Sequence, residues 1–202
     1  MRGRFLYRFI KLIATPFIYI LYRPKIVNKH LIPKDGCIVM SGNHVQALDP
    51  ILLVMSTKRG IRFLAKKELH RGPLKYILDG VGAIPVDRQK GDSKAREHAV
   101  EILKDNQALA VFPEGTRNRT KEKLLPFKFG AVSFAKKTNA LIVPFAIVGR
   151  FKLIGGKLKI VYGEPFSIED MELEDANKLL YQKISDLMDA NAIICKEEKK
   201  EM

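Results

Sequence analysis

The stretch CIVMSGNHVQALDP, residues 37–50, holds the end of one predicted element and the start of the next. Residues 37–41 are small or apolar and include β-branched side chains, which favours a buried strand. Asp49 followed by Pro50 is typical of a helix start, with aspartate as the cap and proline in the first turn. His44 stands between the two, directly after the predicted strand. A strand, a polar loop and a helix in this order form the repeating unit of α/β folds.

The same alternation continues along the chain. Five further apolar runs predict strands at residues 61–65, 82–86, 108–112, 141–148 and 158–163. Helical patterns cover residues 49–58, 72–79, 92–105, 127–138 and 173–192. Strands that alternate with helices predict an α/β fold, here a single domain with a mostly parallel central sheet flanked by helices. The last two strands are joined by GRFKLIGGK, which favours a hairpin and therefore a mixed sheet.

Composition limits the class of protein without choosing a function. The chain has 202 residues and a formal net charge of +14, so it attracts phosphates of nucleic acid, anionic lipid or a phosphorylated substrate. No nucleic-acid-binding module is recognisable, and basic and aromatic residues form no ladder, so nucleic acid is not an expected partner. The two cysteines and four histidines show no ligand spacing, so neither a metal site nor a bound cofactor is predicted.

Residues 1–25 predict an amphipathic helix docked on a membrane surface. The charge-free run 12–22 is too short to cross a bilayer, which takes about 20 residues. On a helical projection Arg8 and Lys11 share a narrow basic face opposite a wide aromatic and aliphatic face, as in helices of the lipid interface. Pro16 predicts a kink or a division into a helix pair. The alternative is an ordinary N-terminal helix packed on its own core.

His44 and Asp49 allow two interpretations. Ligands of open α/β sheets bind beyond the carboxyl ends of strands, and His44 stands just past such an end. The four intervening residues can fold the Asp49 carboxylate back onto the imidazole, which leaves the other ring nitrogen as a general base. Asp49 can equally serve as a simple cap for the helix that starts at Pro50. Spacing alone gives the two interpretations equal weight.

The sequence FPEGTRNR, residues 112–119, follows another predicted strand. Gly115 permits a tight turn whose backbone N–H groups face outward, and the forked guanidinium of Arg117 binds phosphate bidentately. A surface turn with a solvated arginine would explain Gly115, but not why Glu114 and Arg117 stand at a strand end. The turn is therefore a candidate anion site.

Further cations follow two more predicted strands. Lys66 or Lys67 follows the strand at 61–65, and Arg88 follows the strand at 82–86. A parallel sheet brings such strand ends to one edge, so these cations are expected near His44. No serine or cysteine nucleophile motif and no phosphate-binding P-loop is present. A histidine base at this edge is therefore expected to deprotonate a substrate hydroxyl directly, next to a phosphate.

Four motifs occur in order, with an additional AKxEL segment. They are NHxxxxD at 43–49, AKxEL at 65–69, PVDR at 85–88, FPEGTR at 112–117 and the apolar LIVPFAIV at 141–148. In this combination the chain resembles the glycerolipid acyltransferases, specifically the bacterial 1-acyl-sn-glycerol-3-phosphate acyltransferases. The resemblance covers about residues 37–150. It implies a docking segment at 1–25 and an acyltransferase domain at 26–202.

The resemblance implies a reaction and roles for its residues. His44 would take the proton of the sn-2 hydroxyl of lysophosphatidic acid, oriented by Asp49, while the oxygen attacks an acyl thioester and phosphatidic acid forms. Pro144 and its apolar neighbours would line the acyl channel, and Glu114 would position the glycerol end or Arg117. The residues implied in binding the phosphate and glycerol are Lys66, Arg88, Glu114, Gly115, Thr116 and Arg117.

The resemblance also implies partners and a location. The co-substrate would be acyl-CoA or an acyl-[acyl carrier protein], with no bound cofactor, and the enzyme of phospholipid biosynthesis would lie monotopically on an anionic membrane surface, at the cytoplasmic face of the cell membrane. The alternative is another acceptor of the same superfamily. Such an acceptor would be glycerol-3-phosphate, another lysophospholipid, or a precursor of lipid A or of an ornithine lipid.

Overall fold

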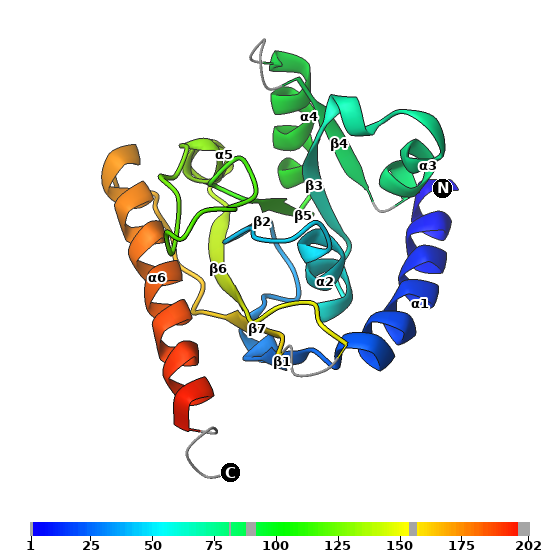
Figure 1. Ribbon diagram of the computed structural model, residues 1–202. Coiled ribbons are helices and arrows are strands. Elements are labelled where there is room, and N and C mark those ends of the chain that lie inside the picture. Colours follow the sequence, from blue (N-terminus) through cyan, green and yellow to red (C-terminus); the bar gives the residue numbers. More distant parts are fainter. Residues whose placement is uncertain (1, 81, 88–91, 154–156, 198–202) are drawn as a thin grey trace.

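A computed structural model describes residues 2–80, 82–87, 92–153 and 157–197 of the chain (Figure 1). The strands are β1 (Lys25–Val27), β2 (Ile38–Gly42), β3 (Ile61–Lys66), β4 (Ala83–Val86), β5 (Ala108–Val111), β6 (Leu141–Val148) and β7 (Lys159–Tyr162). The α-helices are α1 (Arg2–Tyr22), α2 (Asp49–Ser56), α3 (Gly72–Gly80), α4 (Ser93–Lys104), α5 (Gly130–Thr138) and α6 (Leu173–Glu197). Two short 3-10 helices, η1 (Lys29–Leu31) and η2 (Lys67–Leu69), complete the elements.

All strands join one sheet in the order β1-β7-β6-β2-β5-β3-β4. Neighbouring strands run parallel except β6 and β7, which form the expected antiparallel hairpin. The predicted single α/β domain with a mostly parallel, mixed sheet is therefore confirmed. The strand β1 was not predicted, because three residues are too few to show a period; it is held by parallel pairing with β7.

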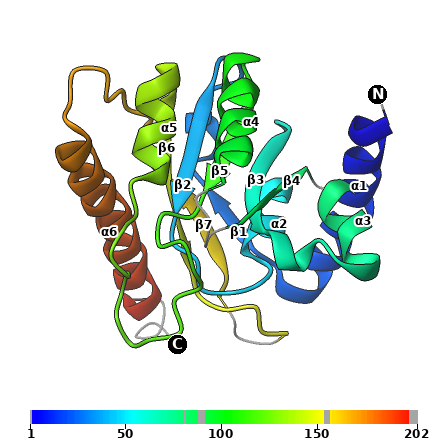
Figure 2. The ribbon, with the colours of Figure 1, turned by 90° about the horizontal axis from the view of Figure 1, so that it is seen from above.

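Helices cover both faces of the sheet. Figure 2 shows α4, α5 and α6 on one side, and α2, α1 and α3 on the other, with α1 and α3 farthest from the strands. Each face has its own apolar core. The first core holds Leu103 of α4, Val132 of α5 and Leu180 of α6. The second holds Leu52 and Leu53 of α2. Because both faces are covered, β2, β5, β6 and β7 are buried nearly throughout, whereas β1, β3 and β4 are partly exposed.

The sheet brings four strand ends to one edge. β2, β5, β3 and β4 are adjacent and mutually parallel, so their carboxyl ends at Gly42, Val111, Lys66 and Val86 lie at the same edge. The loops that carry the motifs all leave the sheet there. The convergence expected from the sequence is thus present for the described parts of these loops.

The helix α1 is continuous across Pro16, so the predicted division into a helix pair is wrong. Its start packs on α2 and α3. The Tyr7 hydroxyl accepts the backbone N–H of Ile61, 3.2 Å away, and the Lys11 ammonium donates to the carbonyl of Thr57. Burial and then the neighbouring charge of Lys29 lower the pKa of Lys11. The side of α1 that faces the domain therefore carries both polar and apolar residues: Tyr7 and Lys11 are hydrogen-bonded, and Ile18 is buried.

The opposite side of α1 is apolar and exposed. Leu12 and Ile20 are 74% and 73% exposed, and Phe17 is 63% exposed. Surface helices usually turn their large apolar residues inward, whereas α1 leaves these three exposed. None of the helices in the described part of the chain has the length and hydrophobicity needed to cross a bilayer.

Candidate functional site

His44 and Asp49 form a hydrogen-bonded pair beyond the end of β2. The ring Nδ1 of His44 lies 2.9 Å from Oδ2 of Asp49, and the carboxylate is fully buried while the imidazole is 17% exposed. The same oxygen accepts the backbone N–H groups of Val45 and Gln46, at 2.8 and 2.7 Å. These bonds hold the carboxylate in place and orient the ring, whose second nitrogen remains for proton transfer.

The expected capping role of Asp49 is wrong. The helix α2 begins at Asp49, its cap position is Leu48, and no side chain makes a cap hydrogen bond. The carboxylate instead turns back toward the preceding loop and binds N–H groups there. Pro50 does occupy the first turn of α2, as the sequence predicted.

Aromatic packing supports the histidine ring. The imidazole stacks on Phe112 with ring centroids 4.3 Å apart, and Phe112 meets Phe145 edge to face at 6.0 Å. A Cβ added to Gly42 would lie 2.4 Å from atoms of Phe145, so only glycine allows this close approach of β2 and β6. Phe112 was part of a quoted motif but carried no predicted role, because stacking across loops leaves no local pattern.

The segment after β5 forms the predicted tight turn. The N–H of Gly115 donates to the carbonyl of Phe112 at 3.0 Å, and Gly115 has a φ of +67°. Thr116 and Arg117 are exposed and line the cavity in front of His44. Lys128 also lines this cavity, and its side chain approaches Gly115 closely. The sequence analysis missed Lys128, which precedes α5 and follows no strand.

Three further predicted residues have three different outcomes. Lys66, at the end of β3, is exposed and lines the same cavity. Arg88 lies outside the described residues. Pro144 lies in the middle of β6, contacts the position of Gly163, and is not among the lining residues of either cavity described here.

Glu114 is buried, with only 3% of its surface exposed. Its two carboxylate oxygens accept the backbone N–H groups of His44 and Leu125, both at 2.9 Å. Burial raises the pKa of Glu114, and the two backbone bonds oppose that shift. Glu114 does not line the cavity that contains His44 and Arg117.

The cavity in front of His44 has a volume of about 1230 Å³. One wall is cationic, with Lys66, Arg117 and Lys128. Two acidic residues, Asp87 and Asp92, lie on its rim, and Asp92 also caps α4 through the N–H of Ala95. The other wall is apolar and runs from the dyad toward α1, between α2 and α3. Its apolar lining includes Ala14, Leu48, Ile51, Val54, Met55, Leu69 and Leu78.

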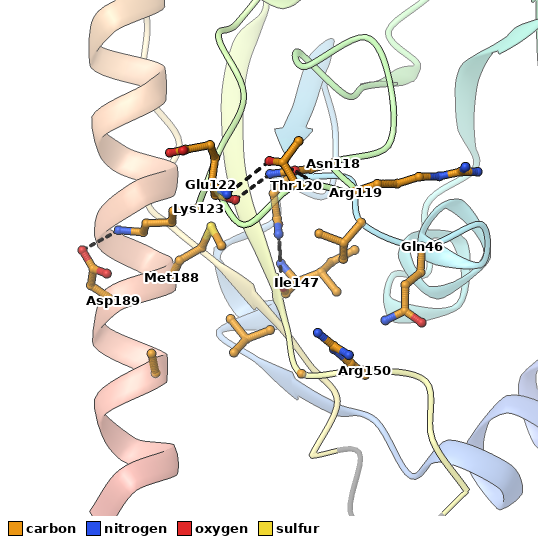
Figure 3. Close-up of a pocket in the computed structure, with 15 residues that line it drawn as sticks. Gln46, Asn118, Arg119, Thr120, Glu122, Lys123, Ile147, Arg150, Met188 and Asp189 are labelled. Atoms are coloured by element: carbon orange, nitrogen blue, oxygen red, sulfur yellow. Dashed lines mark hydrogen bonds and ion pairs between the residues drawn. The ribbon is translucent and has the colours of Figure 1, made fainter.

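A second cavity of about 600 Å³ lies on the other side of the loop that carries His44 (Figure 3). It is bounded by α6, the end of β6 and residues 118–123. Asn43 exchanges two hydrogen bonds with the backbone of Ile147 there, at 2.7 and 2.9 Å. Lys123 forms an ion pair with Asp189 of α6 at 2.5 Å. Arg119 lines both cavities.

Among the described residues, no group of three or more histidine, cysteine or acidic side chains is arranged to hold a metal ion. The site consists of one histidine–aspartate pair, several cations and an apolar wall. This set of groups can deprotonate a hydroxyl, bind a phosphate and accommodate an aliphatic chain.

Comparisons with known proteins agree with this geometry. A family model described as acyltransferase matches residues 23–148. Over 154 residues the chain is 34% identical to the 1-acyl-sn-glycerol-3-phosphate acyltransferase of Bacillus subtilis (strain 168), covering 72% of this chain and 75% of that protein. Over 118 residues it is 37% identical to the protein of the same name from Helicobacter pylori, covering 57% and 50%.

Two further comparisons add to these. The 1-acyl-sn-glycerol-3-phosphate acyltransferase of Borreliella burgdorferi is 32% identical over 119 residues, 57% of this chain and 47% of that protein. The chain thus spans about half the length of two of these three relatives. The crystal structure of the 1-acyl-sn-glycerophosphate (LPA) acyltransferase PlsC from Thermotoga maritima superposes with a TM-score of 0.78 at 23% identity, covering 94% of this chain and 81% of that one. This likeness shows the shared fold.

Proposed function

The chain belongs to the 1-acyl-sn-glycerol-3-phosphate acyltransferase family, and we propose that it moves a fatty acyl group from an acyl thioester to the sn-2 hydroxyl of 1-acyl-sn-glycerol-3-phosphate. The products are phosphatidic acid and the free thiol. The observation that supports this most directly is the 2.9 Å contact between His44 and Asp49, placed in a cavity with a cationic and an apolar wall.

His44 acts as the general base. Its second ring nitrogen takes the proton of the sn-2 hydroxyl as that oxygen attacks the thioester carbonyl carbon. Asp49 holds the Nδ1 proton and stabilises the imidazolium that forms. When the tetrahedral state collapses, the carbon–sulfur bond breaks and His44 returns the proton to the departing thiolate. No serine or cysteine is acylated in this scheme.

The cationic wall binds the phosphate of the acceptor. Arg117 and Lys66 approach the cavity from two different strand ends, and Lys128 adds a third positive charge. An arginine fork matches phosphate geometry, and the two lysines supply compact charges around it. Lysophosphatidic acid carries this phosphate next to the reacting hydroxyl, as the arrangement requires.

The apolar wall accommodates the acyl chains. It leads from His44 between α2 and α3 toward Ala14 and Thr15 of α1, so a chain in it would run toward the docking helix. This assignment replaces the expectation for Pro144, because the lining residues on this wall come from α1, α2, η2 and α3 instead of β6.

The helix α1 docks the domain on an anionic membrane, which would put the protein on the cell membrane as a monotopic enzyme. One side of α1 lines the substrate cavity through Lys11, Ala14 and Thr15, and the other side exposes Leu12, Phe17 and Ile20. A helix in the lipid interface buries such a face in the headgroup region. The lysolipid can then pass from the bilayer to His44 along the same helix.

An acceptor panel tests the proposal. The full chain would be assayed with lysophosphatidic acid, glycerol-3-phosphate and other lysophospholipids, each with acyl-CoA and with acyl-[acyl carrier protein]. We expect turnover with lysophosphatidic acid, and a loss of about 10²–10⁴-fold in kcat for His44→Ala at an unchanged melting temperature. Near-normal turnover by this variant would exclude the mechanism. Preference for another acceptor would move the chain to that activity within the same superfamily.

A further inference from the structure

Glu114 is charged and buried at the site, yet it does not line the substrate cavity. It is 3% exposed, and the lining of the cavity passes from Pro113 to Gly115 without it. A substrate in the cavity therefore cannot reach its carboxylate without a rearrangement of the loop. Direct contact with the glycerol end, which the resemblance implied, does not account for this position.

The carboxylate instead joins two backbone segments. Oε1 accepts the N–H of His44 and Oε2 accepts the N–H of Leu125, both at 2.9 Å. His44 and Glu114 are far apart in the sequence, so the first bond links the loop after β2 to the turn after β5. Hydrogen bonds from N–H groups to a carboxylate are among the stronger ones in proteins.

The same turn also holds the carbonyl of His44. The N–H of Asn118 donates to this carbonyl at 2.7 Å. Asn118 is itself fixed, because its side chain donates to the carbonyl of Glu122 and accepts from Thr120, as Figure 3 shows. The N–H and the C=O of His44 are therefore both bound by residues 114–118.

Three successive N–H groups of the loop are accepted by two carboxylates. Glu114 takes that of His44, and Asp49 takes those of Val45 and Gln46. The backbone of residues 44–46 is thus held by hydrogen bonds to Glu114 and Asp49, in addition to the contact between the imidazole and Asp49.

Burial and hydrogen bonding act in opposite directions on the carboxylate of Glu114. Burial raises the pKa of Glu114, which means that the folded protein disfavours the ionised form. A glutamine of the same shape would avoid that desolvation, but it has one acceptor oxygen and could satisfy only one of the two N–H groups. The carboxylate is therefore suited to hold both N–H groups at once, and one of them belongs to His44.

We propose that Glu114 is a positioning residue for the base: its bridging carboxylate fixes the His44 peptide and so keeps the imidazole on Phe112 and Asp49. The inference rests on the proposed function, since it assumes that His44 is the base. In this proposal Glu114 holds the histidine base in position, whereas Arg117 in the same motif binds the phosphate.

Kinetics of matched variants test the assignment. Glu114→Gln keeps the side-chain volume and one acceptor, Glu114→Ala removes both acceptors, and Glu122→Gln removes an exposed carboxylate from the same segment as a control. We expect kcat to fall about 10-fold in Glu114→Gln and about 100-fold in Glu114→Ala, since displacements of about 1 Å cost up to that much. KM for lysophosphatidic acid should stay within about threefold of wild type in all three variants. An increase in KM at unchanged kcat would overturn the proposal in favour of substrate binding.

Amide NMR of the wild-type chain provides a second, independent arm. The His44 and Leu125 amide protons should resonate downfield and exchange slowly, whereas that of exposed Thr116 should exchange fast. In Glu114→Gln at least one of the two should lose its protection. If the wild-type His44 amide exchanges as fast as that of Thr116, the bridge does not exist in solution and the proposal fails. A wild-type chain inactive on every acceptor would refute the proposed function, while this arm would still decide whether Glu114 holds the loop.

Discussion

At the scale of single residues, the side chains of FPEGTR, residues 112–117, lie in two different environments. Glu114 is buried against the backbone of His44, whereas Arg117, three residues later, is exposed in the cavity. The turn at Gly115 separates these two directions, since its positive φ reverses the chain between them. On the proposed function, one short motif would thus serve both the base and the phosphate.

Substitution of Arg117 should affect the acceptor and leave the chemistry largely intact. We expect Arg117→Ala to raise KM for lysophosphatidic acid about 10-fold or more, because a charge-assisted bond to phosphate contributes roughly 1.5–3 kcal/mol. Steady-state kinetics with varied acceptor would show it. KM for the thioester donor is the internal control. An unchanged acceptor KM would remove Arg117 from the phosphate site.

The raised pKa of Glu114 predicts a pH dependence of stability. A carboxyl whose folded pKa exceeds its unfolded value, about 4.3, contributes stability below that value and loses it as pH rises through the folded pKa. The unfolding free energy of wild type should therefore fall relative to Glu114→Gln as pH rises from about 4 toward neutrality. Denaturant titrations at several pH values measure the difference. A difference that is independent of pH would contradict the shift.

At the scale of elements, the orientation of α1 distinguishes this helix from the others. Lys11 and Tyr7 bond to the backbone of α2's C-terminal end and of β3. Several of the large apolar residues of α1 are exposed, although Ile18 is buried. Helices α2, α4, α5 and α6 place buried apolar residues against the sheet. On the proposed function, a membrane would be the partner of this exposed apolar face beside the cavity.

Replacing the outward residues of α1 tests this role. We expect Leu12→Glu combined with Ile20→Glu to abolish sedimentation with anionic vesicles, because both apolar side chains would lose their burial in the interface. The melting temperature should stay near that of wild type, since both positions are about three-quarters exposed. Lys75→Glu on the neighbouring α3 is a charge control. Full retention on vesicles by the double variant would exclude docking through this face.

At the scale of the whole molecule, charge and architecture act together. The chain has a formal net charge of +14. Its larger cavity runs from the carboxyl edge of the sheet to α1. On the proposed function, the charge would attract the protein to anionic lipid from solution, and the apolar face of α1 would then hold it there. The lipid surface and the reacting histidine would thus be connected through one continuous cavity.

The charge predicts salt-sensitive membrane binding. We expect affinity for anionic vesicles to fall at least about 10-fold between 0.05 and 0.5 M salt, because screening shortens the range of each lysine and arginine to a few ångströms. Sedimentation with zwitterionic vesicles at both salt concentrations is the control. Equal binding to both vesicle types would show that the apolar face of α1 acts without the charge.

The sequence by itself determined the chain order of the helices and of every strand except β1, and the edge at which the polar residues gather. Both follow from local signals, since apolar periods mark the elements and parallel strands bring their carboxyl ends together. The sequence therefore predicted correctly that His44, Asp49, Lys66 and Arg117 share one region.

Only the tertiary structure decided which partner each of these side chains has. From the sequence, Asp49 was equally suited to cap a helix or to bond to His44. In the structure the loop folds back over the carboxylate, so Asp49 bonds to His44 and makes no cap. The partner of Glu114 is a backbone N–H 70 residues away, and Lys128 reaches the site from the start of a helix. Contacts between residues in different loops produce no periodic pattern in the sequence, so they cannot be predicted from it. The same holds for α1, whose period reveals an apolar face but not whether that face meets the core or the solvent.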